Sequence, residues 1–357
     1  MVNFKYLGAT TFGDPRDVLK FGTLDALPST TKDDEILVRV EFAELNPVDL
    51  QKLHPGPDKA GLAVPKPPLV TGYGGSGTIV AFHGGNSEEK SQLKVGDSVI
   101  FLADPRRSMG AYATHVVVDE QCVAKVENES LPLAQVASIP LAGCTAYESL
   151  EKLSLEGCSN LLIVGGAGGV GSWATLLAKA QHPDLEIITT ASSEASQSWC
   201  LSMGASRCLP RHDQLSQLPG LEGGRTGSVD RILCLTEPTP ELWKDLTEII
   251  RPYGKICLVV SGKSIQTLDL GFCFFKSVTI LTETVFASQR DNFKNITPAD
   301  EMAAILHVLS NGRIPQTPQS KELAQSFVSW NDALQKGGII DQLASGHTRG
   351  KVVMKID

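Results

Sequence analysis

A glycine cluster directly after an apolar run carries the clearest chemical signal of the sequence. Leu161–Val164 has the composition of a buried strand, and a G-x-G-x-x-G motif follows it and leads into a stretch with helical spacing of apolar residues. In this motif the first glycine permits a tight turn, the second lets the main chain approach a pyrophosphate, and the third lets the helix pack on the strand. Free N–H groups at the helix start then face phosphate oxygens. The pattern predicts a dinucleotide site, with a plain structural turn as the alternative, and the predicted residues are Gly166, Gly168, Gly169, Val170 and Gly171.

Composition and charge limit the classes of partner. The chain has 357 residues, which suggests two domains, and 32 Lys+Arg against 40 Asp+Glu give a net charge of −8. No basic stripe stands out, so we expect neither nucleic acid nor an anionic membrane as partner. The first residues lack the apolar core of a secretory signal, and no apolar run approaches the roughly 20 residues that cross a bilayer. We therefore expect a cytoplasmic protein.

The pattern of the eight cysteines is also typical of a cytoplasmic protein. None forms a C-x-x-C pair, and Cys234 and Cys257 lie in apolar, strand-like runs. A structural zinc lobe needs four closely spaced thiolates, and the sequence has no such group. We interpret the cysteines as buried, reduced thiols.

The first third of the chain is rich in predicted strands. Ile36–Phe42, Ser98–Phe101 and Thr114–Val118 alternate or nearly alternate between apolar and polar residues, with turn signals between them. The proline-rich segment His54–Pro68 is expected to be an exposed loop beside a cleft. This part of the chain predicts a mainly β domain.

From about residue 130, strand-like and helix-like segments alternate, which is typical of a parallel sheet with helices on both faces. The expected strands are Leu161–Val164, Glu186–Thr190, Asp230–Leu235, Lys255–Val260 and Val278–Phe286, and the expected helices are Gly171–Gln181, Gln197–Met203 and Glu241–Ile250. A further helix is predicted at Pro298–Ser310, with Thr297 to cap it and Gly312 to end it. The last strand, Lys351–Ile356, is expected to return to the first domain.

These segments carry a family resemblance over nearly the whole chain. The chain resembles the medium-chain dehydrogenase/reductase superfamily, specifically its zinc-free quinone-oxidoreductase-like branch, and within it the zinc-type alcohol dehydrogenase-like subgroup. The order and spacing of the motifs carry the resemblance: Asn46–Asp49, Gly72–Gly77, Val95–Val99, Gly110–Ala113, Pro140–Glu148, Gly165–Gly171, Met203–Ala205 and Gly350–Val353.

The resemblance implies an α/β fold, in which a Rossmann doubly wound parallel sheet is inserted in a GroES-like β-barrel catalytic domain. It also implies an interdomain active-site cleft and a homodimer. With the change of pattern near residue 130, it predicts residues 1–129 as the GroES-like catalytic domain and 130–290 as the Rossmann NADP(H)-binding domain. Residues 291–357 are then the C-terminal return to the catalytic domain.

At the positions where zinc-dependent relatives have metal ligands, this chain has other residues. Such relatives have a Cys near Asn46, a His-Glu pair near Tyr73-Gly74, and a Cys near Leu141, and a catalytic zinc needs three good protein ligands. Cys144 is offset by three residues from the ligand position, so we expect it to be a free cysteine that lines the cleft. The seven histidines are scattered, and no pair has ligand spacing. We predict that the protein binds no metal.

The end of the second Rossmann strand selects the nicotinamide cofactor. An acidic side chain there binds a free ribose 2′-hydroxyl and repels a 2′-phosphate. The chain has Ser192 and Ser193 at this place and no acidic residue before Glu194, which favours NADP(H) over NAD(H). Relatives usually have a Lys or Arg just after the serine. Arg211 or His212 in the next turn could supply that charge, or could simply be part of a solvated turn.

Without zinc, the easier hydride acceptor is a C=C bond conjugated to a carbonyl, because a simple ketone lacks its Lewis acid. By resemblance, Asn46 and Asp49 lie near the nicotinamide, where Asn46 could donate to the developing oxyanion; a turn after the preceding strand is the alternative. Tyr73 could be a second donor or could only shape the pocket. By resemblance or by their place after a Rossmann strand, the expected nicotinamide or ribose contacts are Thr145, Thr236, Ser261 and Gly262.

The sequence therefore predicts NADPH-dependent reduction of quinones or α,β-unsaturated carbonyls by hydride transfer without zinc. One alternative is a protein that binds the nucleotide without turnover. A second, less favoured alternative is a zinc-dependent alcohol dehydrogenase.

Overall fold

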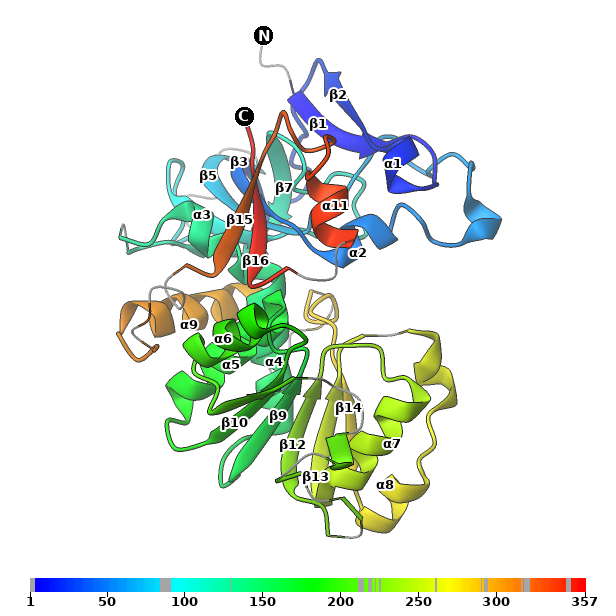
Figure 1. Ribbon diagram of the computed structural model, residues 1–357. Helices are drawn as coiled ribbons and strands as arrows, with labels where there is room; N and C mark the ends of the chain where they lie inside the picture. The colour runs from blue at the N-terminus through cyan, green and yellow to red at the C-terminus, as the bar shows by residue number, and fades with distance from the viewer. Residues whose placement is uncertain are drawn as a thin grey trace. The chain divides into compact units, whose positions relative to one another are not determined.

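The computed structural model of the chain (Figure 1) describes residues 4–83, 91–128, 130–210, 215–217, 220–221, 223–224, 226–260, 262–289, 291, 295–315, 317, 322–344 and 348–357. Contacts divide the chain into two compact units. The first unit comprises Met1–Cys144, Phe286–His307 and Ala324–Asp357, and the second comprises Thr145–Val285 and Val308–Leu323. The domain limits expected from the sequence, after residues 129 and 290, stay a prediction.

The first unit is built on two mainly antiparallel sheets. A three-stranded sheet has the order β2-β1-β4, and a larger sheet has the order β15-β16-β3-β5-β6-β8, with β7 also paired to β3. The strands of this unit are β1 (Phe4–Ala9), β2 (Lys20–Leu24), β3 (Glu35–Glu44), β4 (Leu69–Val70), β5 (Gly74–Phe82), β6 (Ser98–Leu102), β7 (His115–Asp119), β8 (Val123–Lys125), β15 (Ala324–Ser329) and β16 (Lys351–Lys355).

The C-terminal strand closes this unit. β16 pairs antiparallel with β3, and the Leu45 N–H donates to the Val352 carbonyl oxygen at 2.9 Å. The apolar faces of these strands join one core, whose members include Phe4, Val38 and Met354. Short helices connect the strands: α1 (Pro15–Val18), α2 (Pro47–Gln51), α3 (Leu133–Val136) and α11 (Ile339–Ala344).

The second unit contains one parallel sheet with the order β11-β10-β9-β12-β13-β14. Counted from β9, this is the order 3-2-1-4-5-6 of dinucleotide-binding folds, and the direction of winding reverses between β9 and β12. Ligands of such sheets bind beyond the carboxyl ends of the strands at that reversal. The strands are β9 (Asn160–Val164), β10 (Glu186–Thr190), β11 (Arg207–Leu209), β12 (Val229–Cys234), β13 (Ile250–Leu258) and β14 (Thr279–Thr282).

Helices flank this parallel sheet, as the alternating pattern predicted. In Figure 1, α5 (Gly169–Gln181) and α6 (Glu194–Ser202) lie beside β9 and β10, and α7 (Pro240–Ile249) and α8 (Gly271–Lys276) lie beside β12 and β13. Every residue of β9 is buried, as expected for a strand that is covered on both faces. The predicted fold class, with its Rossmann-type sheet, is confirmed.

Most predicted elements form within a residue or two of their expected limits. The helix α9 (Pro298–Ser310) has the predicted bounds, and the Asp300 N–H donates to the Thr297 hydroxyl at 3.2 Å, which caps its N-terminus. The predicted strand Val278–Phe286 is wrong in length, because only Thr279–Thr282 pairs with β13. The His54–Pro68 segment is mostly exposed, but Val64 is buried in the core.

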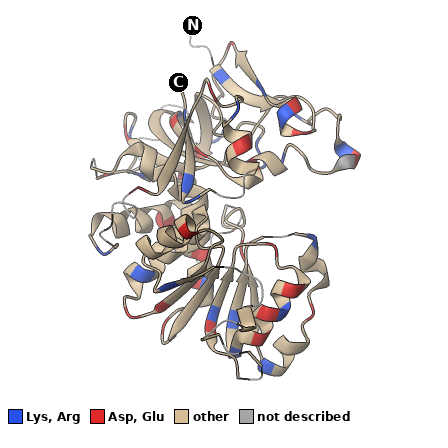
Figure 2. Cartoon of the chain, in the orientation of Figure 1, with Lys and Arg blue, Asp and Glu red and all other residues tan. Residues whose placement is uncertain are grey.

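Basic and acidic side chains are interspersed in each unit (Figure 2). None of the eight cysteines forms a disulfide bond, and six of them are buried, whereas Cys158 and Cys208 are partly exposed.

Candidate functional site

The predicted glycine motif forms the loop between β9 and α5. β9 ends at Val164, Gly165 has a φ of +84°, and α5 begins at Gly169. The end of the neighbouring strand β10 holds this loop, because Thr190 accepts from the Gly165 N–H with its hydroxyl (3.0 Å) and from the Gly166 N–H with its carbonyl oxygen (3.1 Å). The sequence analysis did not identify Thr190. Its position at the end of a buried strand beside the glycine loop is the signal that could have found it.

The three motif glycines are required for different reasons. A Cβ atom on Gly166 would lie 2.6 Å from the Thr189 Cβ, and one on Gly171 would lie 2.6 Å from the Gly165 carbonyl oxygen. A Cβ on Gly168 would instead have only that carbonyl oxygen near it, at 3.7 Å. Packing within the protein thus explains Gly166 and Gly171, whereas Gly168 leaves open space next to the main chain. This is the space that a pyrophosphate needs.

The first turn of α5 presents main-chain donors at that space. The first N–H groups of any helix have no intrahelical carbonyl partner, and here the N-cap residue is Gly168, which has no side chain to satisfy them. Two consecutive hydrogen bonds hold this turn in place. The Trp199 indole N–H donates to the Ser172 hydroxyl at 2.8 Å, and that hydroxyl donates to the Gly168 carbonyl oxygen at 2.8 Å. Gly169, Val170 and Gly171 form this first turn, and their binding of an anion stays a prediction.

Two further predicted contacts follow the later strands of the same sheet. The Thr236 Cγ2 lies 3.2 Å from the ideal Cβ position on Gly165, so this residue borders the loop. Gly262 is the N-cap of a short 3₁₀ helix (Lys263–Thr267), and the Glu237 side chain occupies the space where its Cβ would lie. Ser261 lies outside the described residues. Thr145, near the start of α4 (Cys144–Leu153), is buried, and its carbonyl oxygen accepts from the Ser149 hydroxyl.

The residues predicted to select the cofactor, Ser192 and Ser193, are exposed just after β10. Ser193 caps α6, because its hydroxyl accepts from the Ser196 N–H at 3.2 Å and contacts the Ser196 hydroxyl at 3.0 Å. Ser192 precedes it and is exposed, and Glu194 is the first residue of α6. Arg211 and His212 lie outside the described residues. The preference for NADP(H) stays a prediction.

In the first unit, Asn46 and Asp49 meet at the start of α2. The Asn46 N–H donates to Asp49 Oδ2 at 2.7 Å, and the Tyr112 hydroxyl donates to the same oxygen at 2.6 Å. All three side chains are buried. Burial raises the pKa of the Asp49 carboxyl to about 7, although the hydrogen bonds from Tyr112 and Asn46 act in the opposite direction. The turn that the Asn-Pro pair predicted is present, and it brings the main-chain N–H of Asn46 against the carboxyl group of Asp49.

A buried ion pair completes this group of polar residues. Lys351, the first residue of β16, is 4% exposed, and its Nζ lies 2.9 Å from Glu44 Oε2, 2.9 Å from the Leu45 carbonyl oxygen and 2.5 Å from Asn46 Oδ1. Glu44 Oε1 accepts from the Leu141 N–H at 2.5 Å. Glycine at position 74 makes room for this carboxylate, because a Cβ there would lie 1.9 Å from Glu44 Oε1. The sequence analysis assigned no role to Glu44 or Lys351.

Tyr73 belongs to the same buried region. Its ring packs edge-on against Phe286 with centroids 5.3 Å apart, and the Lys52 Nζ lies 5.3 Å from the ring centroid. Burial, with a smaller contribution from the charge of Asp49, raises the pKa of the Tyr73 phenol well above its usual value. The hydroxyl therefore stays protonated at neutral pH and keeps a proton to donate.

Several buried polar atoms in this region have no hydrogen-bond partner among the described residues. They are Asn46 Nδ2, Asp49 Oδ1, Thr71 Oγ1, the Tyr73 hydroxyl and Glu44 Oε2, the last of which still forms the ion pair with Lys351. A buried polar group without a partner costs about 1–3 kcal/mol, so such atoms rarely gather without a reason. We call the residues Glu44, Asn46, Asp49, Thr71, Tyr73, Tyr112 and Lys351 the Asn46 cluster, and its unpaired atoms make it a candidate substrate site.

Comparisons with known proteins agree with this architecture. The alcohol dehydrogenase GroES-like domain matches residues 32–128. A zinc-type alcohol dehydrogenase-like protein of Staphylococcus aureus is 33% identical over 269 residues, which cover 72% of this chain and 73% of that protein. The chain belongs to the medium-chain dehydrogenase/reductase superfamily.

Two shorter matches lie in the same superfamily. A 2-methylene-furan-3-one reductase of Solanum lycopersicum is 36% identical over 183 residues, covering 50% of this chain and 45% of that one. An NADPH-dependent alkenal/one oxidoreductase of Arabidopsis thaliana is 33% identical over 184 residues, with the same coverage of 50% and 45%. A solved quinone oxidoreductase from Coxiella burnetii covers 100% of both chains with a TM-score of 0.75 at 22% identity, which shows a shared fold. Membership in this superfamily makes the protein an oxidoreductase.

The positions that hold zinc in metal-dependent superfamily members carry other groups here. Asn46 offers an amide that already binds Lys351, Tyr73 offers a phenol that stays protonated, and Leu141 offers no ligand atom in its side chain. Within the described part of the chain, no group of three His, Cys, Asp or Glu residues could hold a metal ion. Cys144 is buried and forms no disulfide bond. This set of donors does not fit a catalytic zinc.

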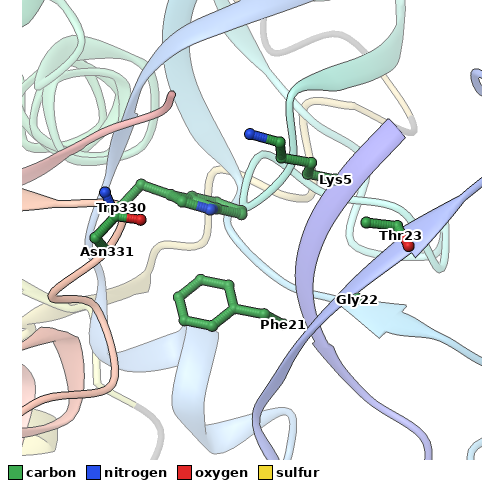
Figure 3. A pocket seen from close by; sticks show the side chains of 6 residues that line it. All are labelled: Lys5, Phe21, Gly22, Thr23, Trp330 and Asn331. Atoms are coloured by element: carbon green, nitrogen blue, oxygen red, sulfur yellow. The ribbon is translucent and has the colours of Figure 1, made fainter. Parts of the chain in front are cut away.

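A surface pocket of about 320 Å³ lies elsewhere in the first unit (Figure 3). Phe21 and Trp330 line it with their ring centroids 5.2 Å apart, next to Lys5. The pocket shares no residue with the Asn46 cluster or the glycine loop. In addition, no helix in the described residues is long and apolar enough to span a membrane.

Proposed function

We propose that the protein reduces quinones or α,β-unsaturated carbonyl compounds with NADPH and without zinc. The observation that carries this proposal is the buried Asn46 Nδ2, a hydrogen-bond donor with no partner among the described residues. Its neighbour Asp49 acts electrostatically on Tyr73, a second buried donor that stays protonated. Such donors suit an oxygen that becomes negative during the reaction. The relatives that reduce a methylene-furanone and alkenals or alkenones support this substrate class.

The residues of the glycine loop fit the pyrophosphate of a nicotinamide dinucleotide, because Gly168 leaves space and the first turn of α5 offers N–H donors. Ser192 and Ser193 would receive the 2′-phosphate, and Thr145, Thr236, Ser261 and Gly262 would contact the ribose or nicotinamide. The bound reduced nicotinamide supplies a hydride. The relative that is named as NADPH-dependent supports NADPH as the cofactor.

In the Asn46 cluster, the side chains stabilise the substrate rather than react with it. When the substrate gains a hydride at its β-carbon, the electron pair of the C=C bond moves and negative charge forms on the carbonyl oxygen. Asn46 Nδ2 and the Tyr73 hydroxyl donate hydrogen bonds to that oxygen, each worth roughly 2.7–4 kcal/mol in comparable sites. A proton from water then binds the α-carbon and completes the reduction. Asp49 holds the Asn46 main chain in place.

We further propose a cytoplasmic homodimer. The edge strand β14 and the helix α8 support the dimer, because Phe274 is 82% and Phe275 is 87% exposed, and exposed apolar groups of this kind mark contact surfaces. The eight cysteines, none of which forms a disulfide bond, support a reducing compartment.

The direct test is NADPH oxidation by the purified protein with 1,4-benzoquinone or 1-octen-3-one, before and after treatment with a metal chelator. We expect turnover that the chelator leaves unchanged. Tight NADPH binding with no turnover over a wide panel would favour a nucleotide-binding protein without catalysis. Activity that disappears with the chelator and returns with zinc would favour a zinc-dependent alcohol dehydrogenase.

A further inference from the structure

We propose that Lys351, held in place by Glu44, is a positioning residue that fixes the orientation of the Asn46 amide so that its NH₂ group faces the substrate oxygen. This inference rests on the proposed function, and it adds residues from a distant part of the sequence to the candidate site.

The ammonium group of Lys351 has three polar partners. It donates hydrogen bonds to the Leu45 carbonyl oxygen and to Asn46 Oδ1, and it forms an ion pair with Glu44 Oε2, 2.9 Å away. Lys351 is 4% exposed and Glu44 is fully buried, so water does not compete for these bonds. A lysine with three fixed partners is a rigid point of attachment.

This arrangement determines which end of the amide faces Lys351. Lysine only donates, so the atom against it must be the amide oxygen, and a flipped amide would place NH₂ against an ammonium group. The other end, Asn46 Nδ2, is buried and has no partner in the described part of the chain. Without Lys351, both orientations of the amide would be open, and only one of them presents a donor to the substrate.

Glu44 holds the lysine in place. Its carboxylate lies 2.9 Å from the Lys351 Nζ and supplies the counter-charge that a buried ammonium group needs. The carboxylate is in turn fixed by the Leu141 N–H and fits only because position 74 is glycine. The pairing of Glu44 with Val353 in β3 and β16 brings both ends of the ion pair together.

A second buried lysine offers a matched comparison. Lys276 is 3% exposed, and its Nζ donates to three acceptors, the carbonyl oxygens of Thr247, Glu248 and Ile250. These acceptors are all main-chain atoms of the second unit, so Lys276 serves the fold alone. Lys351 differs because its partners include the side chains of Glu44 and Asn46, two residues of the candidate site.

The test removes the ion pair as a whole, because Lys351→Met alone would leave Glu44 buried without a partner and could unfold the protein. In Glu44→Gln/Lys351→Met, we expect kcat for 1-octen-3-one to fall roughly tenfold to a hundredfold, while the Kd for NADPH is unchanged. In an Asn46→Ala background, the same pair of substitutions should cause no further loss of kcat. Lys276→Met is the control and should lower stability but not kcat.

Equal losses of kcat with and without Asn46 would overturn the proposal, because Lys351 would then act on stability alone. The side-chain amide ¹⁵N signal of Asn46, identified by its loss in Asn46→Ala, is a readout that needs no turnover. We expect this signal to move in Glu44→Gln/Lys351→Met and to stay in place in Lys276→Met, and an unmoved signal in both would contradict the proposal. If the wild-type protein reduces no quinone or enone, the proposed function fails and this signal still decides the role of Lys351.

If the double variant does not fold, a crystal structure of the wild-type protein with NADP⁺ and octan-3-one decides. We expect Asn46 Oδ1 on Lys351 and Nδ2 within hydrogen-bond distance of the ketone oxygen. A ketone bound away from Asn46 would overturn the proposal.

Discussion

The glycine loop and the Asn46 cluster are built in opposite ways. In the proposed function, the loop would bind the nucleotide with main-chain atoms of consecutive residues, Gly165–Gly171, most of which are glycines. The Asn46 cluster would act through side chains, which come from β3, α2, the region around Thr71–Tyr73, Tyr112 and the start of β16. The residues of the glycine loop lie in one short sequence motif. The Asn46 cluster instead depends on strand pairing between residues about 300 positions apart in the sequence.

Because of this difference, the two sites should tolerate different kinds of amino-acid substitution. In the loop, the required feature is empty space, so any added side chain acts by its volume. In the Asn46 cluster, the required feature is a set of hydrogen bonds with defined donors and acceptors, so isosteric changes matter as much as truncation. Substitutions in the two regions should therefore affect different measured quantities, kcat in the cluster and nucleotide Kd in the loop.

The largest effect is expected for Asn46→Ala in the side-chain site. Loss of one donor to a developing oxyanion lowers kcat by about 10²- to 10³-fold in comparable enzymes, and the Kd for NADPH should not change. Steady-state kinetics with 1-octen-3-one and equilibrium binding of NADPH measure the two quantities. The control is Asn160→Ala, a buried asparagine of β9 whose amide already pairs with Ser228 and Asp230. Equal losses of kcat in both variants would contradict a catalytic role for Asn46.

In the main-chain site, Gly168→Val should leave the fold intact and weaken NADPH binding about tenfold or more, because the side chain enters the space next to the main chain. Gly171→Ala is the matched contrast: its Cβ would lie 2.6 Å from a carbonyl oxygen, so we expect a loss of stability of about 1–3 kcal/mol. Thermal unfolding and NADPH titration distinguish the two. Unchanged affinity in Gly168→Val would mean that the nucleotide binds elsewhere.

A smaller effect is expected where side chains extend the main-chain site. Glu194→Lys places a cation just after Ser192 and Ser193, and a charge-assisted hydrogen bond of roughly 1.5–3 kcal/mol should raise the preference for NADPH over NADH about tenfold. Glu241→Lys makes the same change of charge in the first turn of α7 and serves as the control. If both variants have the same ratio of NADPH to NADH affinity as the wild type, the cofactor is not selected at the end of β10.

The smallest effect concerns the pH dependence of stability in the Asn46 cluster. Burial raises the pKa of the Asp49 carboxyl from 3.8 to about 7, so the folded protein holds this proton where the unfolded chain has lost it. The resulting stability is present below about pH 4 and is lost as pH rises through 7. Asp49→Asn lacks this titration. The Tm of the wild type, measured relative to the Tm of the variant at the same pH, should therefore fall by a few degrees from pH 5 to pH 8. A constant difference would show that the Asp49 carboxyl is not protonated in the folded state.

The sequence predicted the second unit well because its physical signals are local. Apolar runs gave the strands of the parallel sheet, and the glycine motif gave the loop at Gly166–Gly171. Thr190 was missed because its position at the end of a strand becomes informative only once the pairing of β10 with β9 puts that end beside Gly165. The length of β14 was also wrong, since an apolar run does not reveal where pairing stops.

The Asn46 cluster could be predicted only in part. The resemblance named Asn46, Asp49 and Tyr73, and the structure brings Asn46 and Asp49 into one hydrogen-bonded group with Tyr73 nearby. Glu44 and Lys351 were not predicted, because the sequence shows only two charged residues and does not reveal that they are buried and paired. Their meaning depends on the register between β3 and β16, which no local pattern encodes.

The most direct test of the account is the rate of NADPH oxidation with 1-octen-3-one in chelator-treated protein, measured side by side for the wild type and Asn46→Ala. The account predicts full activity of the treated wild type and a loss of about 10²- to 10³-fold in the variant. A treated wild type that is inactive until zinc is restored, or a variant as active as the wild type, would contradict it.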